Sequence, residues 1–185
     1  SVNGENMTGD FMEEQHSSNG APISDRPYMF GGHLEPVRLP WNWATERLTN
    51  ARNYWIATTR ADGRPHSRPV WGVWLDDAFY FSTGSLAAGN LAANPTITLH
   101  LESGSEAVII EGTAEVVSDR ALLERVVALY NEKYHWDIDA NNLPGPYYAV
   151  HSQVAFGWVS DETGLDGGAA FHGTATRWRF NIARE

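Results

Sequence analysis

Short stretches in which apolar and polar residues alternate dominate the chain from about residue 54 onward, and turn residues separate them. A period of two is typical of half-buried strands. The strands that it predicts are YWIATTR, HSRPVWGVWL, FYFST, TITLHLE, AVIIEGTAEVV, YYAVHSQVAFGWVS and TATRWRFNI. Asp62-Gly63 is a strong hairpin signal after the first strand, and DDA is the turn before FYFST. We therefore expect consecutive strands to pair in antiparallel fashion.

Helical patterns occur at three places between these strands. Ser118 or Asp119 can cap a helix whose apolar residues recur at helical spacing. LPWNWATERLTNARN reads as a short helix, and FSTGSLAAGNLAANP reads as a strand end, a turn of small residues and the first turns of a helix. Six or seven strands with two or three helices indicate a mainly β (α+β) protein built on a small antiparallel barrel rather than a βαβ sheet.

The first part of the chain follows neither period. Residues 1–36 are polar, with scattered Gly, Ser, Asn and Pro. We interpret them as a mobile N-terminal arm that orders only against a partner subunit, and we assign 37–185 to the barrel domain.

Composition and charge exclude several classes of partner. The chain has 185 residues, enough for one domain with a core, and its net charge of −10 repels nucleic acid and anionic lipid. No apolar run approaches a membrane span, and the first residues lack the blocks of a signal peptide, so we expect a soluble, cytoplasmic protein. The absence of cysteine excludes disulfides, thiolate nucleophiles and cysteine metal sites.

The familiar catalytic motifs are absent as well. The sequence contains no G-x-S-x-G elbow, Walker loop, G-x-G-x-x-G or H-E-x-x-H. Its histidines stand singly, and we interpret His100, inside a strand, as structural and His135 as favourable at a helix C-terminus. If the protein is an enzyme, a borrowed cofactor carries the chemistry. Trp71 and Trp74 face opposite sides of a regular strand, so one can line a cleft for a planar ring, although the pattern alone favours plain barrel packing for both.

The order of the motifs resembles one known family. TTRADGRPHSRPVWGVWLDDAFYFSTG, NLAANP, EGTAEVV, YYAVHSQVAFGW and TATRWRF follow one another as in the pyridoxamine 5′-phosphate oxidase-like superfamily. The likeness runs from about Trp41 to Phe180 and is nearest to the actinobacterial type assigned to flavin or coenzyme F420. It implies a split β-barrel of the FMN-binding type that forms a homodimer, with cofactor sites at the subunit interface.

The resemblance also implies where a cofactor would lie. In the family, the strand equivalent to SRPVWGV lies along the cofactor ring, and the following strand end lies by the ribityl chain and phosphate. The cofactor-binding residues implied for this chain are Arg68, Pro69, Val70, Trp71, Ser82, Thr83, Gly84, Ser85, Asn90, Arg177 and Trp178. For Arg177 a salt bridge to a carboxylate is an equal alternative.

The chain departs from the family at the phosphate. The helix that begins near Ser85 normally carries one or two basic residues, but here those positions are Leu86, Ala87 and Gly89. Each lost charge-assisted contact weakens binding by about 1.5–3 kcal/mol. Arg68, nearby hydroxyls and backbone N–H groups remain to hold a phosphate.

Three functions follow as hypotheses. The first is an oxidoreductase that transfers hydride between F420 or FMN and a small organic substrate, with His66, Tyr80 or His151 as proton donor. The second is a cofactor-free member whose emptied phosphate corner serves as an apolar substrate pocket, which fits specialised metabolism. The third is a binding or storage protein, for example for haem held by His100 and His151.

Overall fold

Nine strands form one antiparallel sheet in the computed structural model, which describes residues 20–27 and 37–180. The strands are β1 (Ile23–Asp25), β2 (Tyr54–Thr59), β3 (Pro65–Val70), β4 (Gly72–Leu75), β5 (Ala78–Ser82), β6 (Thr96–His100), β7 (Glu106–Val116), β8 (Tyr147–Val159) and β9 (Thr176–Arg179). The helices among these residues are α1 (Trp41–Asn50), α2 (Ser85–Ala93), α3 (Arg120–Tyr134) and α4 (Ala169–Thr174).

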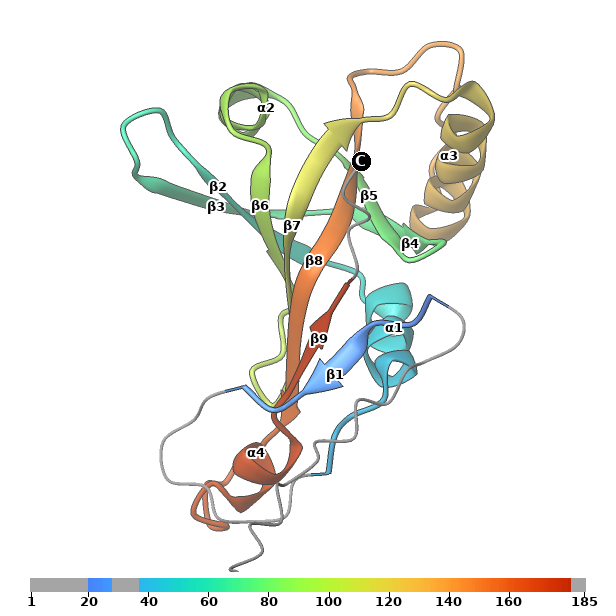
Figure 1. Cartoon of the computed structure of the whole chain (residues 1–185). Coiled ribbons are helices and arrows are strands. Elements are labelled where there is room, and N and C mark those ends of the chain that lie inside the picture. Colours follow the sequence, from blue (N-terminus) through green and yellow to red (C-terminus); the bar gives the residue numbers. More distant parts are fainter. Residues whose placement is uncertain (1–19, 28–36, 181–185) are drawn as a thin grey trace, which may run out of the picture.

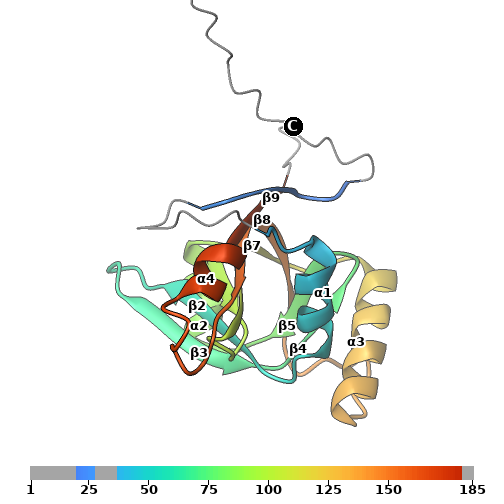
Figure 2. The same cartoon turned by 90° about the horizontal axis from the view of Figure 1, so that it is seen from below.

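The sheet curls into a barrel that is split at one seam. Pairing runs in the order β4-β5-β8-β7-β6-β2-β3, and β8 also pairs with β9, which carries β1 at the outer edge. The two ends of the curl, β3 and β4, are joined through Trp71 without pairing to each other. Figure 2 shows the strands curling around the interior, with α1 and α3 outside. The predicted split barrel is thus confirmed.

A bulge divides β8 into two halves that pair with different strands along one edge. Its first half pairs with β5 up to His151, and its second half pairs with β9 from Val154 onward. Between these halves the register with β7 shifts at Glu111/Gly112. Gly112 is required there because a Cβ would lie 2.1 Å from the carbonyl oxygen of His151. Bulges bend the strand that carries them, which here separates the two halves of β8. Figure 1 shows β7 and β8 as the long central pair.

Two apolar clusters hold the structure together. The first fills the barrel interior and includes Tyr54, Phe79, Phe81, Leu99 and Trp178. The second lies between α3 and the outer side of β4, β5 and β8, where Val126, Val127, Tyr130 and Tyr134 meet Tyr80, Tyr147 and Ala149. Asp119 caps α3, because its carboxylate accepts the N–H of Leu122 at 2.7 Å, as predicted.

Three elements differ from the sequence-based prediction. HSRPVWGVWL is two strands that break at Trp71, because β3 pairs with β2 whereas β4 pairs with β5. The predicted loop 161–173 contains most of the short helix α4. Within the expected arm, Ile23–Asp25 pairs with β9 of the same chain, and residues 1–19 and 28–36 lie outside the described residues.

Among the described residues, no helix is both long enough and apolar enough to cross a bilayer.

Candidate functional site

One cavity of about 620 Å³ lies at the seam of the barrel. Five segments surround it: Asn53 just before β2, the β3–β4 junction, the turn from β5 into α2, the C-terminal end of α3, and the loop that leads into β8. Its lining residues are Asn53, Arg68, Pro69, Val70, Trp71, Ser82, Thr83, Gly84, Tyr130, Trp136, Ile138, Pro144, Gly145, Pro146 and Tyr147. We call the side near Trp71 and Trp136 the ring end and the side near Ser82–Gly84 the phosphate end.

Aromatic side chains form the ring end. The indole of Trp71 stacks on Tyr134, with ring centroids 4.4 Å apart and planes at 3°. Trp136 tilts against the same indole at 5.1 Å and 54°. The indole N–H of Trp71 donates to Asn53 at 3.1 Å, and the guanidinium of Arg52 lies 5.0 Å from the ring centroid. Trp71 is thereby fixed on several sides.

The backbone of Trp71 and Gly72 is held from behind by α3. The hydroxyl of Tyr130 donates to the carbonyl of Trp71. The hydroxyl of Tyr134 accepts the N–H of Gly72 at 2.9 Å, and Lys133 donates to the carbonyl of Gly72 at 3.0 Å. A Cβ at Gly72 would meet the ring of Phe79 at 2.2 Å, so only glycine allows this close approach. The seam is therefore rigidly specified where β3 ends and β4 begins.

Burial shifts the pKa of the groups that form this support. Burial, followed by the charge of Arg52, lowers the pKa of Lys133 to about 8. Burial raises the pKa of Tyr130 and Tyr134, so both phenols stay protonated at neutral pH. The support thus consists of neutral hydroxyls and one partly buried amine.

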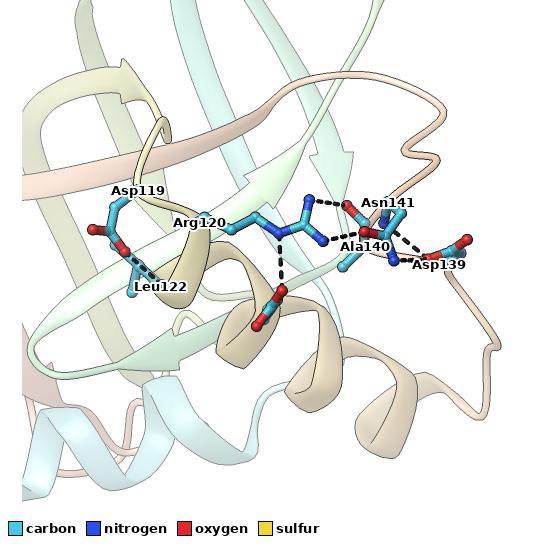
Figure 3. Close-up of polar contacts among 7 residues, drawn as sticks. Asp119, Arg120, Leu122, Asp139, Ala140 and Asn141 are labelled. Atoms are coloured by element: carbon cyan, nitrogen blue, oxygen red, sulfur yellow. Dashed lines mark hydrogen bonds and ion pairs between the residues drawn. The ribbon is translucent and has the colours of Figure 1, made fainter.

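The loop between α3 and β8 forms the outer wall and is tied down at three points. The side-chain amide of Asn131 clamps Ile138, accepting its N–H at 2.9 Å and donating to its carbonyl at 3.0 Å. Arg120 donates to the carbonyl of Ala140 and to the side chain of Asn141 (Figure 3). The hydroxyl of Ser82 donates to the carbonyl of Pro146 at 2.8 Å. These bonds make the wall a preformed surface.

The phosphate end offers hydrogen-bond donors, and the cavity as a whole contains a cation. Arg68 is the single charged residue among the described residues that line the cavity. Helix α2 begins after Gly84 with no side-chain cap, which leaves backbone N–H groups at its N-terminus available. Thr83 is only 8% exposed, and its hydroxyl is buried with no hydrogen-bond partner among the described residues. A buried hydroxyl without a partner is costly, which marks this corner as suited to a polar ligand.

The three positions that lack basic residues differ in environment. Leu86 is 41% exposed, Ala87 is completely buried in the core, and a Cβ at Gly89 would meet nothing within 4 Å. A lysine at position 87 would therefore disrupt packing, whereas 86 and 89 accept longer side chains.

The structure brings seven of the predicted cofactor-binding residues to the cavity and places three others elsewhere. The seven are Arg68, Pro69, Val70, Trp71, Ser82, Thr83 and Gly84. Asn90 is buried and donates to Thr58, Trp178 is core, and Arg177 forms a bidentate pair with Asp25 at 2.7 Å. Ser85 is the first residue of α2.

None of the three predicted proton donors lines the cavity. His66 lies on β3 with its Nδ1 buried and unpartnered among the described residues. Tyr80 is buried in the cluster under α3, and burial raises its pKa. His151 is exposed and paired with Glu115 at 2.8 Å.

The strand register also separates the two histidines considered for haem. His100 on β6 lies opposite Ile109 on β7, and Ile109 lies opposite Phe156 on β8. His151 is five residues away from Phe156 along β8. At about 3.3 Å per residue the two rings are too far apart to ligate one iron within a chain. No cluster of three or more potential metal ligands occurs among the described residues.

Sequence reasoning did not identify the wall opposite β3. The patterns place Tyr130 only on a helix and Tyr147 only in a strand, and they give Trp136 no role. The helical period indicated only that Tyr130 faces inward. The two prolines around Gly145 were a signal for a fixed turn, but not for its place beside the barrel seam.

The comparisons with known proteins agree with this fold. The family model described as Pyridoxamine 5′-phosphate oxidase matches residues 44–180. None of the curated proteins matches the sequence.

Among solved structures, an FAD-binding protein from Mesorhizobium loti aligns with a TM-score of 0.52 at 18% identity, covering 76% of this chain and 95% of that one. The haem storage protein HutZ from Vibrio cholerae aligns with a TM-score of 0.53 at 20% identity, covering 63% of this chain and 92% of that one. General Stress Protein 26 from Bacillus anthracis aligns with a TM-score of 0.53 at 18% identity, covering 63% of this chain and 91% of that one. At these identities the likeness is one of fold.

Proposed function

The chain belongs to the pyridoxamine 5′-phosphate oxidase family, and on this premise we propose that its cavity binds FMN or F420 and serves hydride transfer to a small organic substrate. One observation carries the proposal: a single cavity contains a cation, Arg68, and joins a hydroxyl-lined end to an aromatic end. A phosphorylated flavin or deazaflavin has the same two-part chemistry, with an anion at one end and a planar ring at the other.

The phosphate end fits an anion without a cluster of basic residues. Arg68 supplies charge, the uncapped start of α2 supplies backbone donors, and Thr83 supplies a hydroxyl that has no other partner among the described residues. Ser82 is already engaged with Pro146 and would hold the loop rather than the ligand.

The ring end fits a planar group. β3 is the last strand of the curl, so its outer backbone edge pairs with no other strand in the described part of the chain. Pro69, which lacks an N–H, is tolerated there because an edge strand does not need that donor. The indole of Trp71, with Tyr134 stacked on it and Trp136 tilted against it, makes this end of the cavity aromatic.

When bound, such a cofactor supplies or accepts a hydride, and one added proton completes the two-electron reduction of an electron-poor double bond. The chain's own residues orient the ring and exclude water. Tyr147 replaces the three earlier candidates as proton donor, because it lines the cavity and its hydroxyl forms no hydrogen bond among the described residues.

We also propose that the chain acts as a homodimer through the outer face of the sheet. A row of neighbouring residues crosses this face from β3 to β8. One of them, Pro69, is exposed, and the others are partly exposed. The row consists of Pro69, Trp55, His100, Ile109 and Phe156. Because Pro69 also lines the cavity, a partner on this face would stand beside the site.

Sedimentation tests the dimer. Ile109→Glu should convert dimer to monomer, whereas Val116→Glu, which changes an exposed valine outside the row, should not. A monomeric wild-type chain would contradict this part of the proposal.

The cofactor is tested by titrating the purified chain with FMN, F420 and riboflavin while following their absorbance and fluorescence. We expect at least one of FMN and F420 to bind with a Kd of about micromolar order. Riboflavin, which lacks the phosphate, should bind about 10- to 100-fold more weakly than FMN. If neither FMN nor F420 binds in this range, the proposal is wrong.

A second candidate function is a cofactor-free binding site for an apolar substrate. The apolar first turn of α2, with Leu86 exposed and Ala87 buried, favours it. In that case wild-type chain would not bind FMN, and the double variant Leu86→Lys with Gly89→Arg would gain binding. Strong FMN binding by wild-type chain excludes this candidate.

A further inference from the structure

The sequence contains a single lysine, Lys133, and its surroundings are unusual. The other basic residues, among 13 in total, are all arginine. Lysine side chains are usually exposed, but Lys133, near the end of α3, is partly buried and forms no ion pair with a carboxylate of the described residues. Burial, followed by the charge of Arg52, lowers its pKa to about 8. A sizeable share of this amine is therefore neutral, and thus nucleophilic, near neutral pH.

The amine lines a second cavity, which shares no lining residue with the cavity at the barrel seam. The second cavity has a volume of about 340 Å³ and lies between α1 and α3, over β4 (Figure 2). Its lining residues are Thr49, Val73, Trp74, Leu129, Glu132 and Lys133. Thr49 and Glu132 are exposed and form the rim, whereas Val73 is buried and Trp74 and Leu129 are partly buried. A polar rim over an apolar floor fits a small organic molecule.

The hydrogen bonds of Lys133 direct its lone pair toward this cavity. The Nζ donates to the hydroxyl of Tyr54 at 2.7 Å and to the carbonyl of Gly72 at 3.0 Å, whereas its third contact, to the carbonyl of Thr49, is longer at 3.4 Å. A neutral amine has two hydrogens, and they keep the two shorter bonds. Its lone pair then takes the remaining direction, toward Thr49, which lies at the rim of the second cavity.

The protein tolerates the loss of these two bonds. The carbonyl of Gly72 also lies 2.9 Å from the hydroxyl of Tyr134, which can donate to it. The hydroxyl of Tyr54 donates to the carbonyl of Leu48, so it needs no hydrogen from Lys133. Modification of the amine therefore leaves no buried N–H or O–H group without an acceptor.

We propose that the second cavity is a covalent site for a small apolar aldehyde, with the Nζ of Lys133 as the nucleophile. An aldehyde is an electrophile that a neutral amine captures without a further reactant. Val73, Trp74 and Leu129 favour an apolar group on it, and Glu132 at the rim disfavours an anionic one. This inference goes beyond the proposed function and needs no ligand in the cavity at the barrel seam.

The reaction is a reversible condensation without redox change. The Nζ lone pair attacks the carbonyl carbon, a C–N bond forms, and the carbonyl oxygen takes up a proton. The resulting carbinolamine loses its hydroxyl as water, which carries away the carbonyl oxygen and both hydrogens of the amine. The product is an imine between Lys133 and the former aldehyde carbon, and water reverses the reaction.

The test traps this imine by reduction with sodium cyanoborohydride in the presence of benzaldehyde. Peptide mass spectrometry then locates the benzylated amine. Arg64→Lys is the matched reference, because Arg64 is exposed on the β2–β3 hairpin and the variant places a second, exposed amine in the same molecule. At about pH 7.5 Lys133 should react about tenfold or more faster than position 64, since an exposed lysine, with a pKa of about 10.4, is almost fully protonated. Equal rates, or a faster reaction at position 64, would overturn the proposal.

A charged aldehyde tests the class of ligand. Glyoxylate carries the same reactive group as benzaldehyde, but its carboxylate is unsuited to the apolar floor. In the Arg64→Lys variant, the preference for Lys133 over position 64 should be about fivefold or more smaller with glyoxylate than with benzaldehyde. An equal or larger preference with glyoxylate would overturn the assignment to an apolar aldehyde.

Filling the cavity tests whether it is the place of the reaction. Leu129→Trp should slow benzylation of Lys133 about fivefold or more, while methylation by the much smaller formaldehyde should stay within about twofold of the wild type. Retained formaldehyde reactivity with undiminished benzylation would overturn the proposal. If Leu129→Trp does not fold, Thr49→Trp at the exposed rim gives the same comparison.

Discussion

The two ends of the cavity are built very differently. At the ring end, Tyr130, Tyr134 and Lys133 hold the backbone of Trp71 and Gly72, and almost every polar group has a partner. At the phosphate end, the hydroxyl of Thr83 has no partner among the described residues and α2 has no side-chain cap. The hydrogen bonds that hold the ring end form within the protein, whereas the phosphate end has donors that a ligand can still bind. Ligand orientation is therefore set at the ring end, and the free energy that a ligand can still contribute lies at the phosphate end.

The glycines at the two ends give the largest expected contrast. Gly72→Ala should destabilise the fold by about 3 kcal/mol or more, because the new Cβ overlaps Phe79 at 2.2 Å and the carbonyl of Tyr80 at 2.8 Å. Chemical denaturation measures this loss. A loss below about 1 kcal/mol would show that the seam yields easily and that the ring end is not rigid.

Removing one hydroxyl from the ring end should have the next largest effect. Tyr134→Phe leaves the buried N–H of Gly72 without its partner, and the expected loss of stability is about 1–3 kcal/mol. Tyr80→Phe is the matched control, because Tyr80 lies in the cluster under α3 and its hydroxyl forms no hydrogen bond among the described residues. It should change stability by less than about 0.5 kcal/mol. Equal effects of the two variants would contradict the role assigned to Tyr134.

The same glycine replacement in the phosphate end should have the opposite sign. A Cβ at Gly89 meets nothing within 4 Å, and the residue lies inside α2 with helical backbone. Gly89→Ala should therefore stabilise the fold by about 0.5–1 kcal/mol through the helix preference of alanine. Thermal unfolding would detect this as a higher Tm, and a lower Tm would mean that α2 is constrained in a way its surroundings do not show.

The smallest expected effect is a pH dependence from the ring end. The pKa of Lys133 is lowered to about 8, below its value of about 10.5 in an unfolded chain. Between these values the unfolded state binds the proton and the folded state does not, so stability should rise from pH 8 toward pH 10. Lys133→Met should abolish this rise when denaturation midpoints are compared across the range. If the stability of the wild type instead fell between pH 8 and pH 10, and Lys133→Met removed that fall, the predicted direction of the pH dependence would be contradicted.

The sequence predicts the barrel well because its strands are bounded by local signals. Asp62-Gly63 and the aspartates of DDA mark turns by themselves, and the structure places Asp76 and Asp77 at positive φ as such a turn requires. The break at Trp71 has no local signal, since it depends on hydroxyls of α3 that lie about sixty residues away in sequence.

The site divides in the same way. The family pattern predicts Arg68–Trp71 and Ser82–Gly84, which the structure brings to one cavity. It does not predict Trp136 or the loop into β8, because their position depends on side-chain clamps from Asn131 and Arg120. Arg177 and Trp178 keep their motif, but they lie at an ion pair with Asp25 and in the core.

Thr83→Val tests the central claim most directly, when its stability and its FMN affinity are measured together. The variant removes a buried hydroxyl without a partner while keeping the shape of the side chain. We predict that the ligand-free protein becomes equally or more stable, that FMN binds about 10- to 100-fold more weakly, and that riboflavin binding stays unchanged. A less stable variant with unchanged FMN affinity would contradict the assignment of this corner to a phosphate.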